Sequence, residues 1–205
     1  MGSREHRRAE ERERQRDGIL DVALRAFAAA GYAGTSMNDI ASGSGHSVGH
    51  VYNVIGNKAA VFNAVMLREG NRLAKRINTA DAAHADDPTE AIDEIIDAIL
   101  DFFDDHREFF EIYLRHAAGI RANVERVFSP ALAQLKKKTD NRIMRLFQRA
   151  ADQGLTAALS PADMTIAFGE LINGFIAAWA FAGYQGRISR KSKIIKHLLW
   201  KGIGA

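Results

Sequence analysis

The placement of proline constrains the fold of this chain more than any other feature. Only three prolines occur in 205 residues. They lie in the pairs Asp87-Pro88, Ser129-Pro130 and Ser160-Pro161. Aspartate and serine cap helix N-termini, and proline fits the first helical turn, where its missing amide is not needed. All three prolines are therefore predicted to begin helices, and none to break an element from within.

Apolar spacing supports an all-α chain. No strand-like alternation bounded by turns occurs, whereas apolar residues recur three and four positions apart through most of the sequence. The expected helices cover about 17–30, 36–43, 47–54, 58–77, 130–153, 161–183 and 189–201. A further helix is expected to start at Pro88 and to carry an apolar stripe over 92–103, and another stripe starts at residue 109. Residues 78–87 read as a polar linker. We therefore expect about nine helices: a three-helix N-terminal domain and a larger C-terminal helical bundle.

The composition excludes several classes of protein. Hydrophobic residues make up 47% of the chain, which is enough for a packed core. The absence of cysteine excludes disulfides, thiolate nucleophiles and cysteine-bound zinc. No apolar run reaches the roughly 18 residues of a membrane helix, and the polar N-terminus does not resemble a secretory signal. A cytoplasmic protein without a membrane partner is expected.

Residues 35–58, TSMNDIASGSGHSVGHVYNVIGNK, have the layout of a helix-turn-helix. Ser36 and Asp39 have the spacing of a capping box at the start of the first helix. Gly43 and Gly45 permit a sharp turn between the helices. The residues expected to pack the two helices together are Ile40, Ala41, Val51 and Ile55. In such a motif the second helix enters the DNA major groove.

This N-terminal region resembles the TetR/AcrR family of transcriptional regulators. The residues that carry the resemblance are Ile19, Leu20, Ala23, Phe27, Gly31, Tyr32, Thr35, Ser36, Ile40, Ala41, Gly45, Ser47, Gly49, Tyr52 and Lys58. The sequence departs from the family pattern at Val48, where lysine is frequent, and at His50, where threonine or serine is usual. Val54 and Ile55 replace the usual aromatic pair. The departures at 48 and 50 affect the expected operator sequence and not the fold.

The resemblance implies that Lys58 and the Tyr52 hydroxyl bind DNA phosphates. Thr35 and Ser36 stand at a helix start, where amides and hydroxyls can hold a phosphate without a cation. The expected readers of base edges are Ser47, Val48, His50 and Asn53. A valine can contact a thymine methyl group, and an asparagine can pair with adenine. The alternative is that residues 35–58 are only a packed helical hairpin.

Other site motifs are weak. His46 and His50 are four residues apart, but no third ligand accompanies them, so no metal is expected. The glycines at 43, 45 and 49 match no dinucleotide or phosphate-loop pattern. No nucleophile, catalytic triad or metal cluster can be identified. The chain is therefore expected to be no enzyme and to need no cofactor.

The segment 171–183, LINGFIAAWAFAG, is uncharged and apolar nearly all round. Such a helix must be buried on more than one face, and a second subunit could cover one of them. The resemblance implies a dimer interface formed by the last two long helices. The residues assigned to it are Gly174, Ala178, Ala182, Ile195, Leu198 and Leu199. The alternative is a core helix buried entirely within one chain.

The C-terminal part is rich in aromatic residues, most of which could simply form core. Collectively they could line a cavity for a small hydrophobic or aromatic effector, with polar anchors. The candidate lining residues are Phe102, Phe109, Tyr113, His116, Phe147, Phe168, Asn173 and Trp179.

Together these features predict a ligand-responsive transcriptional regulator. We expect a homodimer that binds a palindromic operator, acts as a repressor and is released by its effector. The expected parts are a polar arm (1–16), a helix-turn-helix domain (17–60), a connecting helix and linker (61–87), and an effector-binding and dimerisation domain (88–205). The arm is either a solvated helix, a disordered segment or a contact to DNA phosphates. Alternatives are a DNA-binding regulator without effector, and an all-α ligand carrier or enzyme.

Overall fold

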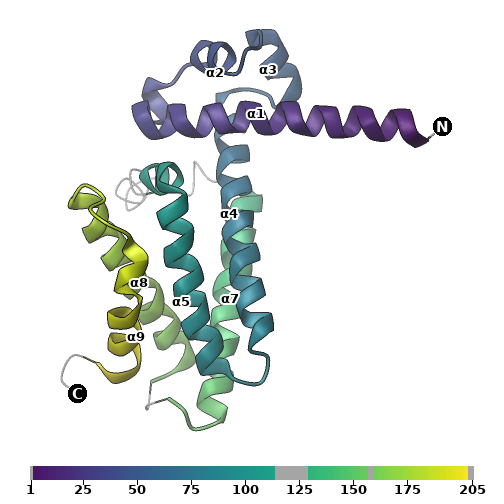
Figure 1. Cartoon of the computed structure of the whole chain (residues 1–205). Helices are drawn as coiled ribbons and strands as arrows, with labels where there is room; N and C mark the ends of the chain where they lie inside the picture. The colour runs from purple at the N-terminus through teal and green to yellow at the C-terminus, as the bar shows by residue number, and fades with distance from the viewer. Residues whose placement is uncertain (1, 114–128, 157–158, 203–205) are drawn as a thin grey trace. The chain divides into compact units, whose positions relative to one another are not determined.

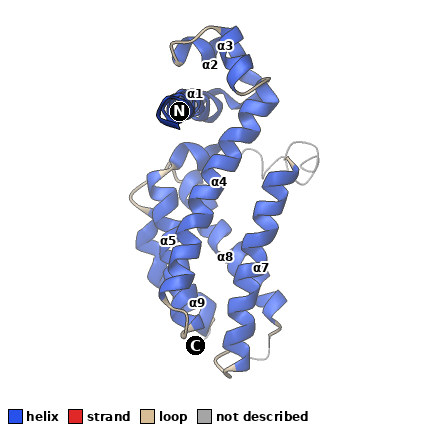
Figure 2. Cartoon of the chain, turned by 90° about the vertical axis from the view of Figure 1, so that its right-hand side faces the viewer, coloured by secondary structure: helices blue, strands red, loops and turns tan. Residues whose placement is uncertain are grey.

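The computed structural model describes residues 2–113, 129–156 and 159–202, and these form α-helices, one 3-10 helix and connecting turns (Figures 1 and 2). The helices are α1 (Gly2–Gly34), α2 (Met37–Gly43), α3 (Val48–Val54), α4 (Lys58–Ala83), α5 (Pro88–Asp105), α7 (Pro130–Asp152), α8 (Pro161–Phe181), the 3-10 helix η2 (Ile188–Lys191) and α9 (Ser192–Lys201). Residues 107–113 are also helical. No strand occurs among the described residues, so the all-α expectation is confirmed.

The proline prediction is confirmed at all three sites, because α5, α7 and α8 each begin at a proline. The Asp87 carboxylate accepts hydrogen bonds from the amides of Thr89 and Glu90. The Ser160 hydroxyl accepts one from the amide of Asp163. These bonds satisfy amides that have no partner inside the helix, which fixes where each helix starts.

Two predicted boundaries are wrong. Helix α1 begins at Gly2 rather than near residue 17, so the polar arm is helical. The break predicted at the end of this helix does occur at Gly31, where φ is 73°. Helix α4 continues to Ala83 through most of the predicted linker. Ala80 is buried and Asp81 pairs with Arg142, and these tertiary contacts hold helical a segment whose sequence is polar.

The chain divides into two compact units. Unit 1 contains Met1–Glu69 and Glu108–Leu132, and unit 2 contains Gly70–Arg107 and Ala133–Ala205. The expected domain boundary near residue 88 lies inside unit 2.

In unit 1, α1 packs against α2 and α3. The buried apolar residues of this core include Ile19, Leu20, Ala23, Phe27, Ile40, Val51 and Phe62. The approach of α2 to α1 is unusually close at Gly43, where an added Cβ would lie 2.8 Å from Val22 Cγ1. The glycine at 43 is therefore required by close packing between helices, and the turn that follows relies on Gly45, whose φ is 71°.

An ion-pair cluster joins α4 to α1 within unit 1. The Arg68 guanidinium lies 2.7 Å from the Asp21 carboxylate and 3.5 Å from that of Asp17. It also donates to the Asp17 carbonyl and, at 3.0 Å, to the fully buried carboxylate of Glu69. A planar guanidinium with several acceptors holds two helices in a defined register.

In unit 2, a row of aspartates on α5 holds α9 and η2. Asp93 accepts a hydrogen bond from the Trp200 indole at 2.7 Å. Asp97 accepts from Ser192 and pairs with Lys196 at 2.7 Å. Because the aspartates are four residues apart, they share one face of α5 and fix the position of the C-terminal helix.

Asp104 anchors the start of η2. Its side chain is only 1% exposed, and it accepts hydrogen bonds from the amides of Ile188 and Ser189 and pairs with Arg187. Burial alone would raise the pKa of this carboxyl. The hydrogen bonds from Ser189 and Ile188 and the charge of Arg187 outweigh burial, so the pKa of Asp104 is lowered and the ionised form predominates near neutral pH.

Among the described residues, α8 is long and apolar enough to cross a membrane by length and composition, with a mean hydropathy of 1.4 over 18 residues. The apolar run expected from the sequence is still shorter than this window, because Glu170 interrupts it. A single such helix is weak evidence for a membrane span, since core helices have the same composition. Only 28% of the window is buried, so much of α8 faces outward.

Replacing Gly43 with alanine is expected to destabilise the protein by about 1–3 kcal/mol, because a β-branched valine on a helix cannot easily move away from the added methyl group. Gly49→Ala is the matched control, since a Cβ at residue 49 meets no atom within 4 Å. The control should be neutral or stabilising by up to about 1 kcal/mol through helix propensity. Chemical denaturation of both variants measures the difference, and equal stabilities would contradict the close approach.

Candidate nucleic-acid interface

The helix-turn-helix is formed by α2, the turn at residues 44–47 and α3. Ser47 caps α3, because its hydroxyl accepts a hydrogen bond from the His50 amide at 3.2 Å. Val51 is fully buried and anchors the inner face of α3. The short helix is therefore held from inside, and its remaining face is available to another molecule.

The outer face of α3 is polar and uncharged. Ser47, Gly49 and Asn53 are exposed, and Tyr52 is 48% exposed. Val48 is half-buried. These side chains can form hydrogen bonds and van der Waals contacts with base edges, but they supply no cation to neutralise phosphates.

His50 lies differently from its expected role. Its ring stacks on His46, with ring centroids 4.5 Å apart, and its Nε2 atom is buried without a hydrogen-bond partner among the described residues. In this structure His50 instead closes the turn between α2 and α3 by packing against His46.

The half-buried Lys58 and the buried Thr35 lie together at the end of α1. Lys58 Nζ donates hydrogen bonds to the carbonyls of Tyr32 at 3.0 Å and Thr35 at 2.9 Å, and it lies over the Tyr32 ring. The Thr35 side chain is buried, and its hydroxyl donates to the carbonyls of Ala26 and Gly31. Thr35 is thus placed as an internal contact, and the ammonium of Lys58 is engaged by the protein's own backbone.

Ser36 remains exposed at the start of α2 and forms the predicted capping box with Asp39. The Asp39 carboxylate accepts hydrogen bonds from the Ser36 hydroxyl at 2.7 Å and from the Ser36 amide at 2.8 Å. These bonds stabilise the ionised carboxylate and lower the pKa of Asp39. A negative charge therefore stands beside the proposed phosphate contact at Ser36.

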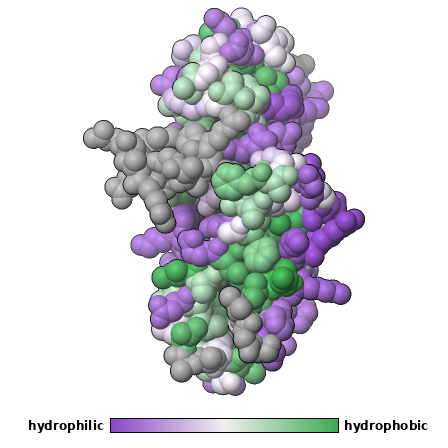
Figure 3. Space-filling view, turned by 90° about the vertical axis from the view of Figure 1, so that its left-hand side faces the viewer, coloured by the Kyte–Doolittle hydropathy of each residue, from purple (hydrophilic) through white to green (hydrophobic). Residues whose placement is uncertain are grey.

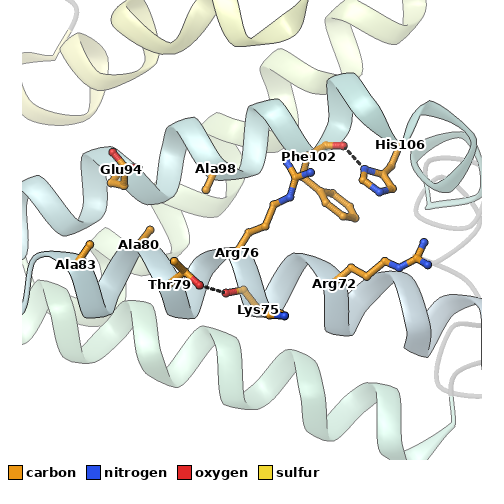
Figure 4. A pocket seen from close by; sticks show the side chains of 10 residues that line it. All are labelled: Arg72, Lys75, Arg76, Thr79, Ala80, Ala83, Glu94, Ala98, Phe102 and His106. Carbon is orange, nitrogen blue, oxygen red and sulfur yellow. Dashed lines mark hydrogen bonds between the residues drawn. The ribbon is translucent and has the colours of Figure 1, made fainter.

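Unit 2 contains a cavity of about 480 Å³ between α4 and α5 (Figure 4). Its residues are Arg72, Lys75, Arg76, Thr79, Ala80 and Ala83 from α4, with Glu94, Ala98, Phe102 and His106. Figure 4 places the cations and aromatic rings toward one end and the three alanines toward the other. Sequence reasoning missed the three cations, although their spacing of three and four residues already placed them on one helical face.

Only one of the predicted effector residues, Phe102, lines this cavity. Phe147 and Phe168 are buried against each other in unit 2, and Trp179 packs on Tyr184. Asn173 is exposed on α8. Phe109 and Tyr113 belong to unit 1, and His116 lies outside the described residues.

Three of the predicted dimer residues are exposed: Gly174 and Ala178 on α8, and Ala182 directly after it. Leu198 and Leu199 on α9 are half-buried. Ile195 is fully buried in the core of its own chain, whereas its neighbour Ile194 is 48% exposed. The outward apolar face of α8 also carries Ile166 and Phe181, which are 65% and 87% exposed.

Figure 3 shows apolar side chains gathered over the face formed by α8 and α9. An exposed apolar surface on a folded protein generally marks a site of association. The position of Ile195 removes it from that surface, because a residue with no accessible area cannot contact a second chain directly.

Residues 19–65 match the family model for bacterial regulatory proteins of the TetR family. The family model thus matches the N-terminal part of the chain. The matched segment runs from the core of α1 to the first turns of α4, so it contains the whole helix-turn-helix. A comparison with curated proteins found no significant match.

Solved structures share the fold of this chain along nearly its full length. The fatty acid degradation regulator FadR from Bacillus halodurans has a TM-score of 0.80 at 16% identity, covering 93% of this chain and 96% of FadR. FadR from Bacillus subtilis, in complex with stearoyl-CoA, has 0.76 at 16%, covering 91% and 98%. AibR, in complex with isovaleryl coenzyme A and operator DNA, has 0.72 at 20%, covering 91% and 98%. At these identities the similarity establishes the fold alone.

Replacing Lys58 with methionine is expected to destabilise the helix-turn-helix unit by about 2 kcal/mol, because it leaves the carbonyls of Tyr32 and Thr35 without their donor. Lys193→Met on α9, where the lysine is exposed, is the control and should be nearly neutral. Thermal unfolding measures both. A Lys58 variant as stable as the parent would mean that the lysine is free to act on DNA alone.

Proposed function

We propose that this protein is a transcriptional regulator that binds a palindromic operator as a homodimer and responds to a small ligand. The main support is α3: within a TetR-family domain, it is anchored by a buried valine and exposes an uncharged polar face. Base-edge recognition needs hydrogen-bonding and apolar groups rather than charge. No enzymatic activity or membrane partner is proposed.

For DNA contact we propose Ser36, Ser47, Val48, Tyr52 and Asn53 as the direct set. His50 and Lys58 are proposed to act mainly by positioning α3 and the start of α4, since both are engaged within the protein. Thr35 is proposed only to support the helix start. Few cations remain at the interface, so the salt dependence of DNA binding should be shallow.

For assembly we propose a homodimer through the exposed face of α8 together with α9. Its support is the outward apolar surface around Ala178 and Phe181. Two copies related by a two-fold axis would present two α3 helices to the two halves of a palindrome. Repression is the proposed output, with DNA release when the ligand binds.

For the ligand we propose a molecule with an apolar portion, as expected from the sequence. Two solved structures of the same fold are complexes with stearoyl-CoA and isovaleryl coenzyme A, so acyl thioesters of coenzyme A are the first class to test. A ligand regulates only by binding the DNA-free and DNA-bound states with different affinity, typically with a coupling of about 1–3 kcal/mol.

Asn53→Ala is expected to weaken binding to the preferred DNA sequence about tenfold, because a bidentate contact to one base is lost. The preferred sequence is first selected from random duplexes with the parent protein. Fluorescence anisotropy then measures both proteins, and thermal unfolding should be unchanged since Asn53 is exposed. Gln134→Ala, at an exposed position of α7, is the matched control. Failure to select any sequence would refute the DNA-binding function.

Ala178→Glu is expected to convert the dimer into a monomer, because a charge would be buried in the apolar interface. Light scattering should give twice the chain mass of 22.6 kDa for the parent and the single mass for the variant. Ala133→Glu, at an exposed position of α7, is the control and should remain dimeric. A parent protein of 22.6 kDa at micromolar concentration would contradict the proposed assembly.

A further inference from the structure

The first half of α1 is a charged helix without a packed side. Residues 5–14 are all exposed, and Ile19 is the first buried residue in the described part of this helix. Figure 1 shows the N-terminal half of α1 running out beyond α3, with no other described helix of unit 1 beside it. Such a helix gains no free energy from packing, so it is stabilised by side-chain pairs along it or by a binding partner.

A stripe of arginines runs along one side of this helix. Arg8, Arg12 and Arg16, here named the basic stripe, follow one another at intervals of four residues. Ile19 lies seven residues after Arg12 and eleven after Arg8, and both separations are close to whole numbers of helical turns. Ile19 is fully buried where α1 packs against α2 and α3, and Val22, almost one turn further on, faces α2. The basic stripe therefore lies on the side of α1 that carries the helix-turn-helix.

The opposite side of the same helix is acidic. The Asp17 carboxylate lies 3.5 Å from the Arg68 guanidinium, so this side of α1 faces α4. Glu13 and Glu10 precede Asp17 by four and seven residues and therefore share that side. Charges of opposite sign are thus separated across the polar arm, with arginines toward the helix-turn-helix and carboxylates toward α4.

The charge of the basic stripe is not cancelled within the chain. None of its three arginines forms an ion pair among the described residues, whereas Arg14 pairs with Glu11 at 4.0 Å. Glu11 also accepts a hydrogen bond from the Gln15 side-chain amide at 3.3 Å. Glu5, three residues before Arg8, lies near the stripe and offsets at most one arginine. Three permanent cations against one carboxylate leave an excess of about two positive charges on this side.

The basic stripe complements a row of phosphates. Arg8 and Arg16 are separated by a length of about 12 Å along the helix. Duplex DNA carries one negative charge for about every 1.7 Å of its axis, so a stretch of this length offers several phosphates. A guanidinium donates paired hydrogen bonds to phosphate oxygens and keeps its charge. Helix α3, by contrast, contains no lysine or arginine, and the Lys58 ammonium is engaged by backbone carbonyls.

We propose that the basic stripe of α1 binds phosphates of duplex DNA beside the bases that α3 contacts, without reading their sequence. The inference rests on the proposed DNA-binding function and adds a contact outside the helix-turn-helix. The uncharged face of α3 would meet the base edges, and the polar arm would neutralise phosphates next to them. The shallow salt dependence expected from the helix-turn-helix alone then describes a protein without these arginines.

The first test compares the full chain with its variant Arg8→Gln/Arg12→Gln. Fluorescence anisotropy measures affinity for the selected duplex over a series of salt concentrations. The variant should bind about tenfold more weakly at low salt, and the slope of log affinity against log salt should fall by about two for each bound chain. The sequence selected from random duplexes should stay the same, since phosphate contacts carry no sequence information. An unchanged slope, or a changed preferred sequence, overturns the proposal.

Two further variants control for net charge and for position on the arm. Lys137→Gln/Lys138→Gln removes two charges at exposed positions of α7 and should keep the parent slope. Glu10→Gln/Glu13→Gln alters the acidic side of the arm and should also keep it, because these carboxylates lie away from the helix-turn-helix. An equal loss of slope in the α7 variant would mean that net charge alone is responsible, and the proposal would fall.

A lysine variant and a lipid surface distinguish phosphate binding from other roles of the stripe. Arg8→Lys/Arg12→Lys keeps both charges and should retain most of the slope, whereas a loss equal to that of the glutamine variant would contradict neutralisation of phosphates. Circular dichroism should give equal helix content for the arm variants, since glutamine and lysine suit a helix about as well as arginine. Binding to anionic phospholipid vesicles that depends on the two arginines, with DNA binding unchanged, would assign the stripe to a membrane surface instead.

Duplexes without the selected sequence separate this inference from the proposed function. Phosphate contacts act on any duplex, so the difference in slope between the parent and Arg8→Gln/Arg12→Gln should persist on them. A parent that selects no sequence, with a reduced slope in the variant, refutes the regulator function and leaves the stripe in place. A parent that selects a sequence, with equal slopes for both proteins, keeps the regulator function and removes the stripe.

Discussion

The ammonium group of Lys58 links the start of α4 to the end of α1 in the helix-turn-helix unit. Where α1 ends, backbone carbonyls lose their helical partners, and Lys58 Nζ supplies donors to two of them, at Tyr32 and Thr35. The Thr35 hydroxyl bonds two further carbonyls of α1. The first residue of α4 is thereby bound to the connection between α1 and α2. Because α2 and α1 also meet at Gly43 with no room for a methyl group, the position of α2, and hence of α3, follows from this junction.

In unit 2, hydrogen bonds and ion pairs position some helices, whereas others are held mainly by apolar packing. The aspartate row of α5 fixes α9 and η2 through directional bonds, which define register without needing a large apolar contact. Helix α8 is the opposite case, because its apolar surface exceeds what its own chain covers. A helix of this composition gains free energy from any further burial, at about 25 cal/mol per Å² of apolar surface. The fold thus leaves one defined face whose stability improves on association.

Local signals predicted most of the fold, and tertiary contacts account for what they missed. Caps and prolines act within a few residues, so the starts of α5 and α8 could be read directly. The extension of α4 to Ala83 depends on burial of Ala80, which no local pattern reveals. Ile194 and Ile195 differ by one residue and so by about 100° around a helix, and only packing decides which one faces outward. Lys58 illustrates the remaining difficulty, because the same lysine suits a phosphate or a carbonyl equally well.

The uncharged face of α3 and the exposed face of α8 are linked by the energetics of DNA binding. A DNA-binding helix with few cations releases few counterions from the DNA. A single copy of such a helix therefore gains little affinity from phosphate contacts. Joining two copies makes the second half-site contact intramolecular, and its effective concentration can raise the overall affinity by about 10²–10⁴ without new contacts. In the proposed dimer, association through α8 would therefore supply affinity that the few cations of α3 do not provide. A chain with a more basic α3 would gain more affinity from phosphates as a single copy and would benefit less from such an assembly.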